Sequence, residues 1–235
     1  MPGGCAGLTE GADLEGLKTM DFARARDLMV ESQVRPSDVT DMRILGAMRT
    51  LPRERFVPPQ RRTLAYADLE LEAAPGRVLL RPRDLAKLIQ ALAPQSGERA
   101  LEIAGATGYG AAVLAACCKE VVTLDPDADL SFAARAALES AGASNVRTVS
   151  TRATDGWADA APYDVIMLNG AAETVPQAWL DQLAPGGRMG VIVREGAAGA
   201  ARIYTRSGDA IAFRVAFDAF PPVAPGLEKP RTFAF

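Results

Sequence analysis

A strand that opens into a helix is indicated by LEIAGATGYG at residues 101–110. After three strand-like residues, four of the next five are glycine or alanine, namely Ala104, Gly105, Ala106 and Gly108. Small residues let the backbone pass close to a ligand, and the first turn of a helix offers unpaired N–H donors. Such turns also occur for packing alone, so the pattern leaves a ligand site and a packing turn equally open.

On both sides of this turn, short apolar runs alternate with helical periodicity, which predicts a mostly parallel, twisted sheet with right-handed crossovers. Strands are expected at 99–103, 121–124, 146–149, 163–168 and 188–193, and helices at 111–116, 128–141 and 174–183. Two further runs, 201–205 and 210–217, flank a turn and predict an antiparallel hairpin at the sheet edge. The expected class is α/β, with a mostly parallel sheet.

Helices are predicted before that sheet. One covers 21–33 and ends before Pro36, a second runs from an N-cap at Ser37 to Leu51, and a third begins at Pro82. The proline-rich and charged stretch between the second and third helices is expected to be irregular. The chain is therefore divided into a disordered extension at 1–19, an N-terminal helical cap at 20–97 and an α/β domain at 98–235.

Acidic residues follow the next two predicted strands. Asp125 lies 21 positions beyond Ala104, and an acid about 20 residues after such a turn is where a ribose diol is held. The alternative is that Asp125 caps a helix that opens at Pro126. Asp155 and Gly156 follow the third strand, where the carboxylate accepts from an adenine amino group or forms an Asx turn. All these positions are at strand ends, where open α/β sheets bind ligands.

The amino-acid composition limits the partners, metal sites and cell compartment that can be expected for this chain. The chain has no histidine, and its 26 basic residues are spread along a chain of net charge −3, which argues against nucleic acid as a partner. Three scattered cysteines predict neither a metal site nor a disulfide framework. There is no apolar run of roughly 18 to 20 residues and no secretory signal pattern, so a cytoplasmic protein without a membrane segment is expected.

Taken together, the chain resembles S-adenosylmethionine-dependent methyltransferases and, more closely, the protein-L-isoaspartate O-methyltransferase family. The likeness runs from about residue 21 to the C-terminal hairpin. It is carried by MRTLPRERFVP at 48–58, AYAD at 65–68, the turn at 101–110, AAVLA at 111–115, DG at 155–156, YDVI at 163–166, AA at 171–172, VP at 175–176 and QLAPGGR at 182–188. PRERFVP at 52–58 is the most family-specific of these segments.

The resemblance implies a Rossmann-like methyltransferase fold in which 98–235 binds S-adenosyl-L-methionine. It also implies methyl transfer to the carboxylate of an isoaspartyl residue in a protein or peptide. An ionised carboxylate attacks a sulfonium methyl without a general base, so a chain that lacks histidine suits this reaction. The cofactor residues implied are Glu102, Ala104, Gly105, Ala106, Gly108, Asp125, Pro126, Asp155 and Gly156.

The sequence departs from the family pattern at the expected site. Ala104 and Ala106 stand where the family usually carries glycine. RVLLRP at 77–82 replaces Thr-Ile-Ser-Gln-Pro, so Leu80 stands where a serine hydroxyl is expected to hold the substrate carboxylate. Arg81 is either another anion contact or a surface cation. The substrate-side positions are Val78, Leu79, Leu80, Arg81, Asn169 and Gly170.

Two function hypotheses remain open on these residues. The first is an enzyme that methylates a protein or peptide carboxylate. The second is a catalytically degenerate paralogue that acts as a binding or regulatory module. A dinucleotide oxidoreductase is disfavoured, because the turn lacks the full glycine pattern of that class and PRERFVP precedes it.

Overall fold

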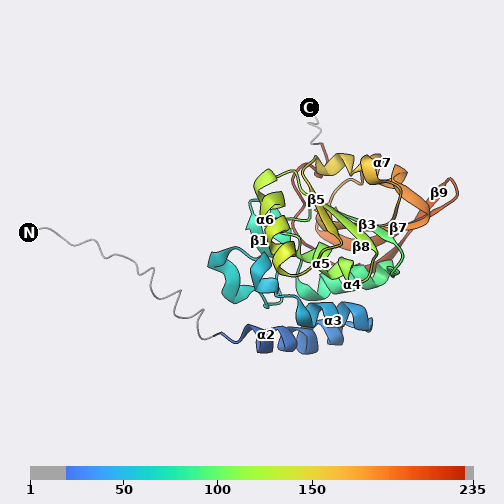
Figure 1. The fold of residues 1–235 in the computed structure, drawn as a ribbon. Helices are drawn as coiled ribbons and strands as arrows, with labels where there is room; N and C mark the ends of the chain where they lie inside the picture. The colour runs from blue at the N-terminus through green and yellow to red at the C-terminus, as the bar shows by residue number, and fades with distance from the viewer. Residues whose placement is uncertain (1–19, 231–235) are drawn as a thin grey trace, which may run out of the picture.

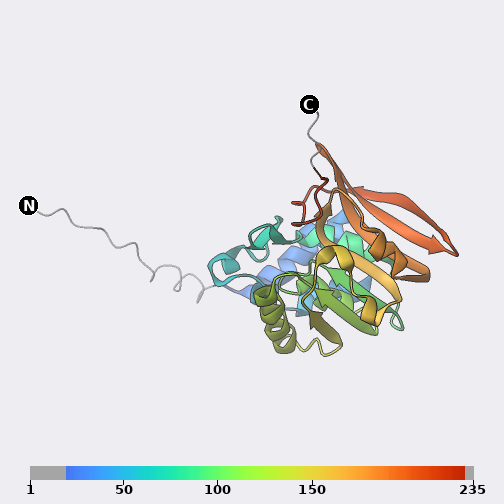
Figure 2. The ribbon, with the colours of Figure 1, turned by 90° about the horizontal axis from the view of Figure 1, so that it is seen from above.

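The fold is built on a seven-stranded sheet, in a computed structural model that describes residues 20–230 (Figure 1). The expected extension at 1–19 lies outside the described residues. The strand order is β5-β4-β3-β6-β7-β8-β9, parallel from β5 to β7 and antiparallel from β7 to β9. This confirms the predicted Rossmann-like α/β class and its antiparallel C-terminal hairpin, which projects from the sheet at the end opposite to α6 (Figure 2).

Every predicted strand of this sheet is present. The strands are β3 (Arg99–Ile103), β4 (Glu120–Leu124), β5 (Val146–Val149), β6 (Tyr163–Ala172), β7 (Leu183–Glu195), β8 (Ala198–Ser207) and β9 (Ala210–Asp218). β6 and β7 are longer than their apolar runs predict. In β6 the reason is that Ala171 continues the ladder with Ile192 of β7 and forms a parallel bridge with Val223 of the C-terminal segment.

Side chains alternate across the sheet and divide the core into two clusters. Ala100 of β3 belongs with α4 (Pro82–Leu92), α5 (Tyr109–Ala115) and α6 (Ala128–Ser140), while Leu101 and Ile103 belong with Trp179 of α7 (Gln177–Asp181). Figure 1 shows α7 and the pair α4 and α5 on opposite sides of the sheet. No helix within residues 20–230 has the length and the apolar character that a bilayer crossing requires.

The N-terminal cap differs from its prediction around Pro36. The α-helix α2 (Phe22–Met29) ends early, and the chain continues as a π turn, η1 (Val30–Val34), and a 3-10 turn, η2 (Arg35–Ser37). Proline clashes with the carbonyl four residues back in an α-helix. The change of helical pitch before Pro36 moves that carbonyl, so the chain stays helical where an end was expected.

The next helix begins later than predicted. Ser37 does not cap it, because its hydroxyl donates to the carbonyl of Gln33 at 2.8 Å and completes the preceding helical segment. The N-cap of α3 (Met42–Thr50) is Asp41, whose carboxylate accepts from the backbone N–H of Arg43 at 2.9 Å. An aspartate at this position stabilises the first turn as the predicted serine would.

The stretch expected to be irregular contains a small hairpin. Two 3-10 turns, η3 (Arg53–Phe56) and η4 (Pro59–Leu64), precede β1 (Leu71–Ala74) and β2 (Arg77–Leu79), which pair antiparallel. The connection is Pro75-Gly76, and Gly76 adopts φ +69°. This two-residue turn is too short a signal to stand out in a segment rich in proline and charge.

Candidate cofactor and substrate site

The turn after β3 holds two alanines in the left-handed region. Ala104 has φ +55° and Ala106 has φ +49°, and Gly108 follows with φ +86°. Both alanine side chains are buried, and the N–H of Gly105 donates to the carbonyl of Leu124 at 2.9 Å. The left-handed conformation costs an L-residue about 1–2 kcal/mol. The turn therefore keeps a conformation that suits glycine while carrying alanine.

Ala104→Gly is expected to raise the free energy of unfolding by about 0.5–1 kcal/mol. Relief of the left-handed penalty exceeds the extra backbone entropy that glycine gives the unfolded chain. Chemical denaturation measures the change. The matched control is Ala136→Gly at an exposed position in the middle of α6, where the same change is expected to cost about 1 kcal/mol. Equal losses in the two variants would contradict the strain at Ala104.

Glu102 lies beneath the turn rather than at the sheet edge. Its side chain is fully buried on the α5 side, and Oε2 accepts from the hydroxyl of Thr123 at 2.7 Å. Burial raises the pKa of this carboxyl to about 8, although the Thr123 hydroxyl opposes the shift. A Cβ added at Gly110 would lie 2.0 Å from Oε1 of Glu102. Glu102 therefore supports the turn from below.

Asp125 is buried at the end of β4 and contacts the turn. Oδ2 accepts from the N–H of Ala106 at 3.1 Å, and Oδ1 accepts from the N–H of Asp127 at 3.0 Å. The N-cap of α6 is Asp127, whose carboxylate accepts from the N–H groups of Asp129 and Leu130. Asp125 thus lies against the turn, where an acid that holds a ligand is expected, and Asp127 rather than Asp125 caps α6. Pro126 between them is exposed.

A third donor reaches Asp125 from outside the sheet. Nε of Arg77, the first residue of β2, donates to Oδ1 at 3.3 Å. The two side chains are 9% and 1% exposed, so this is a buried ion pair. The sequence contains no periodic or spacing signal that joins residues 77 and 125, because the contact depends on where the hairpin packs.

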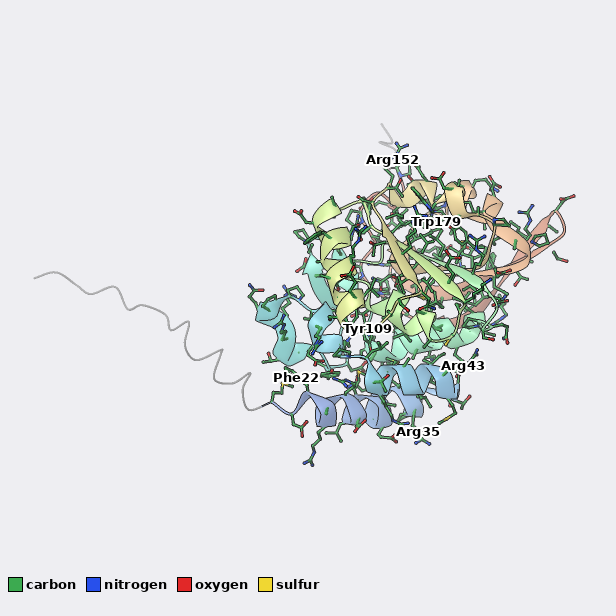
Figure 3. The ribbon with its side chains drawn as sticks, viewed as in Figure 1. Phe22, Arg35, Arg43, Tyr109, Arg152 and Trp179 are labelled. Carbon is green, nitrogen blue, oxygen red and sulfur yellow. The ribbon has the colours of Figure 1, made fainter. Side chains whose placement is uncertain are left out.

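The PRERFVP block packs directly against the turn, a role that sequence reasoning did not assign. The hydroxyl of Thr107 donates to the carbonyl of Phe56, and the ring of Phe56 meets that of Tyr109 at 5.5 Å between centroids. Arg53 is fully buried over the Tyr109 ring at 4.6 Å. Its guanidinium donates to the carbonyls of Ala65 and Leu80. Figure 3 shows Tyr109 inside the molecule, above the N-terminal helices.

Asn169 joins the substrate-side segment to the turn. Its Nδ2 donates to the carbonyl of Val78 at 2.7 Å and to that of Ala104 at 3.1 Å. Its Oδ1 accepts from the N–H of Leu80 at 3.5 Å. Gly170 follows with φ +129°. The structure therefore brings the 78–80 and 169–170 segments together beside the turn, through one buried amide.

The side chains of the substrate-side segment are already engaged. Leu79 and Leu80 are buried in the core. Arg81 makes a bidentate pair with Glu70, with Nε at 2.7 Å from Oε1 and Nη2 at 2.8 Å from Oε2. Glu70 precedes β1 and Arg81 follows β2, so this pair closes the base of the hairpin. Arg81 is thereby already paired within the hairpin, and a contact with an acidic substrate stays a prediction.

Asp155 lies on the outer surface. Its Oδ2 pairs with Arg152 at 2.9 Å and its Oδ1 accepts from the hydroxyl of Thr154 at 3.0 Å. Figure 3 places Arg152 at the outer edge of the molecule, away from Tyr109. Gly156 is buried against Gln182. A role for Asp155 toward adenine stays a prediction, since its carboxylate bonds to surface groups.

The sheet order and the small-residue turn followed by an acid at the next strand define a Rossmann-like methyltransferase fold. A solved protein-L-isoaspartate O-methyltransferase superposes with a TM-score of 0.73 at 24% identity, over 87% of this chain and 66% of that one, just under two thirds. A β-aspartate methyltransferase from Plasmodium falciparum, solved in complex with S-adenosyl-L-homocysteine, gives a TM-score of 0.70 at 16% identity. That match covers 84% of this chain and 97% of that one.

Sequence comparison identifies the family. The profile of the protein-L-isoaspartate(D-aspartate) O-methyltransferases matches residues 24–218, and the chain belongs to that family. A protein-L-isoaspartate O-methyltransferase 1 of Rhodopseudomonas palustris is 40% identical over 168 residues, which are 72% of this chain and 69% of that protein. One from Methylorubrum extorquens is 41% identical over 172 residues, 72% and 74% of the two chains. The suggested family membership is thus confirmed.

Proposed function

We propose that this chain transfers the methyl group of S-adenosylmethionine to a carboxylate of a protein or peptide, with the isoaspartyl carboxylate as the first candidate. The observation that carries the proposal is a set of buried hydrogen bonds that joins the PRERFVP block, β6 and Asp125 to the turn at 104–108. Thr107 bonds to Phe56, Asn169 bonds to Ala104, and Asp125 bonds to Ala106. Together these bonds hold residues 104–107 against PRERFVP, β6 and Asp125, and this arrangement supports a nucleoside site at the turn.

The residues around Asp125 fit an adenosyl group if one hydrogen-bond donor to the Asp125 carboxylate is replaced by the ligand. A carboxylate at the end of β4 accepts from a ribose diol, and Oδ1 of Asp125 already accepts a side-chain donor at 3.3 Å from Arg77. A ribose hydroxyl replaces that donor, while the backbone bonds from Ala106 and Asp127 stay in place. In this proposal the turn at 104–108 and Asp125 hold the nucleoside.

The reaction is a displacement in which positioning supplies most of the catalysis. When bound, S-adenosylmethionine supplies a methyl group activated by a sulfonium. The substrate carboxylate is already ionised at neutral pH, so the chain does not need to remove a proton. Leu79 and Leu80 are buried in the core and add no polar side chain to the site. The Leu80 side chain donates nothing, and its N–H, 3.5 Å from Asn169 Oδ1, is the donor that this segment offers.

Transfer to a peptide that contains isoaspartate, measured against its aspartyl twin, tests the proposal. The expected result is methyl incorporation into the isoaspartyl peptide and little into the twin, because the two differ only in where the carboxylate is placed. Mass spectrometry locates the methyl ester. Equal incorporation into both peptides would contradict an isoaspartyl substrate, and incorporation into neither would contradict transfer to this class of carboxylate.

A second candidate, a binding or regulatory module without transfer, is favoured by the buried Leu80 where a hydroxyl is expected. Leu80→Ser separates the two. In an enzyme that lacks one charge-assisted hydrogen bond, restoring the donor is expected to raise transfer about ten-fold, because such a bond contributes about 1.5–3 kcal/mol. No transfer in either form, with the fold intact, favours the module.

A further inference from the structure

The Arg77–Asp125 pair places a cation of the chain on the acid that the cofactor is expected to use. Nε of Arg77 donates to Oδ1 of Asp125 at 3.3 Å, and both side chains are at most 9% exposed. Nη1 of Arg77 is buried and has no hydrogen-bond partner among the described residues. Burying a guanidinium with unpaired N–H donors costs free energy, and the attraction of the Asp125 carboxylate offsets part of that cost.

The hairpin that carries Arg77 is held in place by side-chain contacts and not by strand pairing with the large sheet. β1 and β2 contain four and three residues and pair with each other rather than with the seven-stranded sheet. A hairpin of this size is at best marginally stable alone, so its position depends on its contacts. The Arg81–Glu70 pair closes its base, and a Cβ added at Gly76 would lie 2.7 Å from Pro225, which shows that its tip packs against the C-terminal segment.

Two contacts of β2 reach the structures that are expected to hold the nucleoside. Besides the ion pair, Asn169 bonds to the Val78 carbonyl and to the Ala104 carbonyl of the turn. Arg77 and Val78 therefore attach the hairpin to both structures that are expected to hold the nucleoside, Asp125 and the turn after β3. A ligand hydroxyl and the Arg77 guanidinium compete for the same Oδ1 atom.

We propose that Arg77 is an internal competitor of the cofactor and sets its affinity: the hairpin β1–β2 covers Asp125 through the Arg77–Asp125 pair and must move outward when the nucleoside binds. This inference rests on the proposed function, because it concerns the same cofactor. The apparent dissociation constant is the intrinsic one divided by the fraction of chains in the open state. Loss of the competing cation raises that fraction.

The test is calorimetry with S-adenosylhomocysteine on wild type and Arg77→Gln. The variant is expected to bind at least ten-fold more tightly, since glutamine is neutral and shorter. The matched control is Arg83→Gln, which removes a neighbouring cation that pairs with Asp68 at 3.1 Å rather than with Asp125, and which is expected to bind as wild type does. Thermal unfolding establishes that each variant is folded.

Hydrogen exchange on the wild-type chain provides a readout that needs no variant. Peptides that cover residues 71–80 are expected to exchange faster when S-adenosylhomocysteine is bound, whereas peptides from α5 are expected to slow. Unchanged exchange in 71–80 on binding would overturn the proposal, as would equal or weaker binding by Arg77→Gln, and either result leaves the proposed function intact. If neither wild type nor Arg77→Gln binds S-adenosylhomocysteine at millimolar concentration, both the competitor role and the proposed cofactor are overturned.

Discussion

Gly110→Ala is expected to lower the free energy of unfolding by about 3 kcal/mol or more, a loss at the upper end of what overpacking a core costs. The added Cβ would lie 2.0 Å from Glu102 Oε1, 3.2 Å from its Cδ and 3.3 Å from Met167 Cε. Glu102 cannot swing away, because it is fully buried and its Oε2 is bonded to Thr123 at 2.7 Å. Either α5 moves off the sheet or the carboxylate loses its bond.

Chemical denaturation measures this loss, and two further variants identify its cause. Gly46→Ala is the control, because nothing lies within 4 Å of the new Cβ in α3, and a gain of about 0.5–1 kcal/mol is expected there. Combining Gly110→Ala with Glu102→Ala removes the opposing carboxylate. The double variant is expected to be more stable than the sum of the two single losses predicts. Strictly additive losses would contradict a clash with Glu102.

The sheet was predictable because its signals are local. The strands predicted at 99–103 and 146–149 have the bounds of β3 and β5, and the apolar run VVTL at 121–124 lies in the buried parallel strand β4. The spacing between the turn and Asp125 was informative for the same reason, because it follows the length of one βαβ step. The β1–β2 hairpin was not predictable, because its three-residue second strand is shorter than any pattern that repeats.

The site was predictable only in part, because its contacts join segments far apart in the sequence. Asp125 was identified from spacing, and the structure places it beside the turn. Arg77 was not identified, since only the packing of the hairpin brings it to Asp125. Asp155 follows a strand as predicted, and its carboxylate pairs with Arg152 on the surface, so its contact with a ligand stays a prediction. Position along the chain does not fix the direction of a side chain.

Glu102→Gln is expected to remove a pH dependence of stability that centres on the buried carboxyl. Burial raises the pKa of Glu102 to about 8 in the folded chain, whereas an exposed glutamate ionises near about 4.3. Between these values the folded chain keeps a proton that the unfolded chain releases, so the contribution of Glu102 is complete below the unfolded pKa and is lost as pH rises toward 8. The slope is about 1.4 kcal/mol per pH unit.

Chemical denaturation of wild type and Glu102→Gln at pH 5, 6 and 7 tests this slope. Titratable groups that the two proteins share cancel when one free energy of unfolding is subtracted from the other. The stability of Glu102→Gln relative to wild type is expected to increase by about 1.4 kcal/mol per unit. Thr123→Val removes the hydroxyl that lowers the pKa of Glu102, so its slope is expected to extend to higher pH, which denaturation at pH 8 and 9 measures. A difference that stays constant with pH would show that Glu102 is ionised in the folded chain.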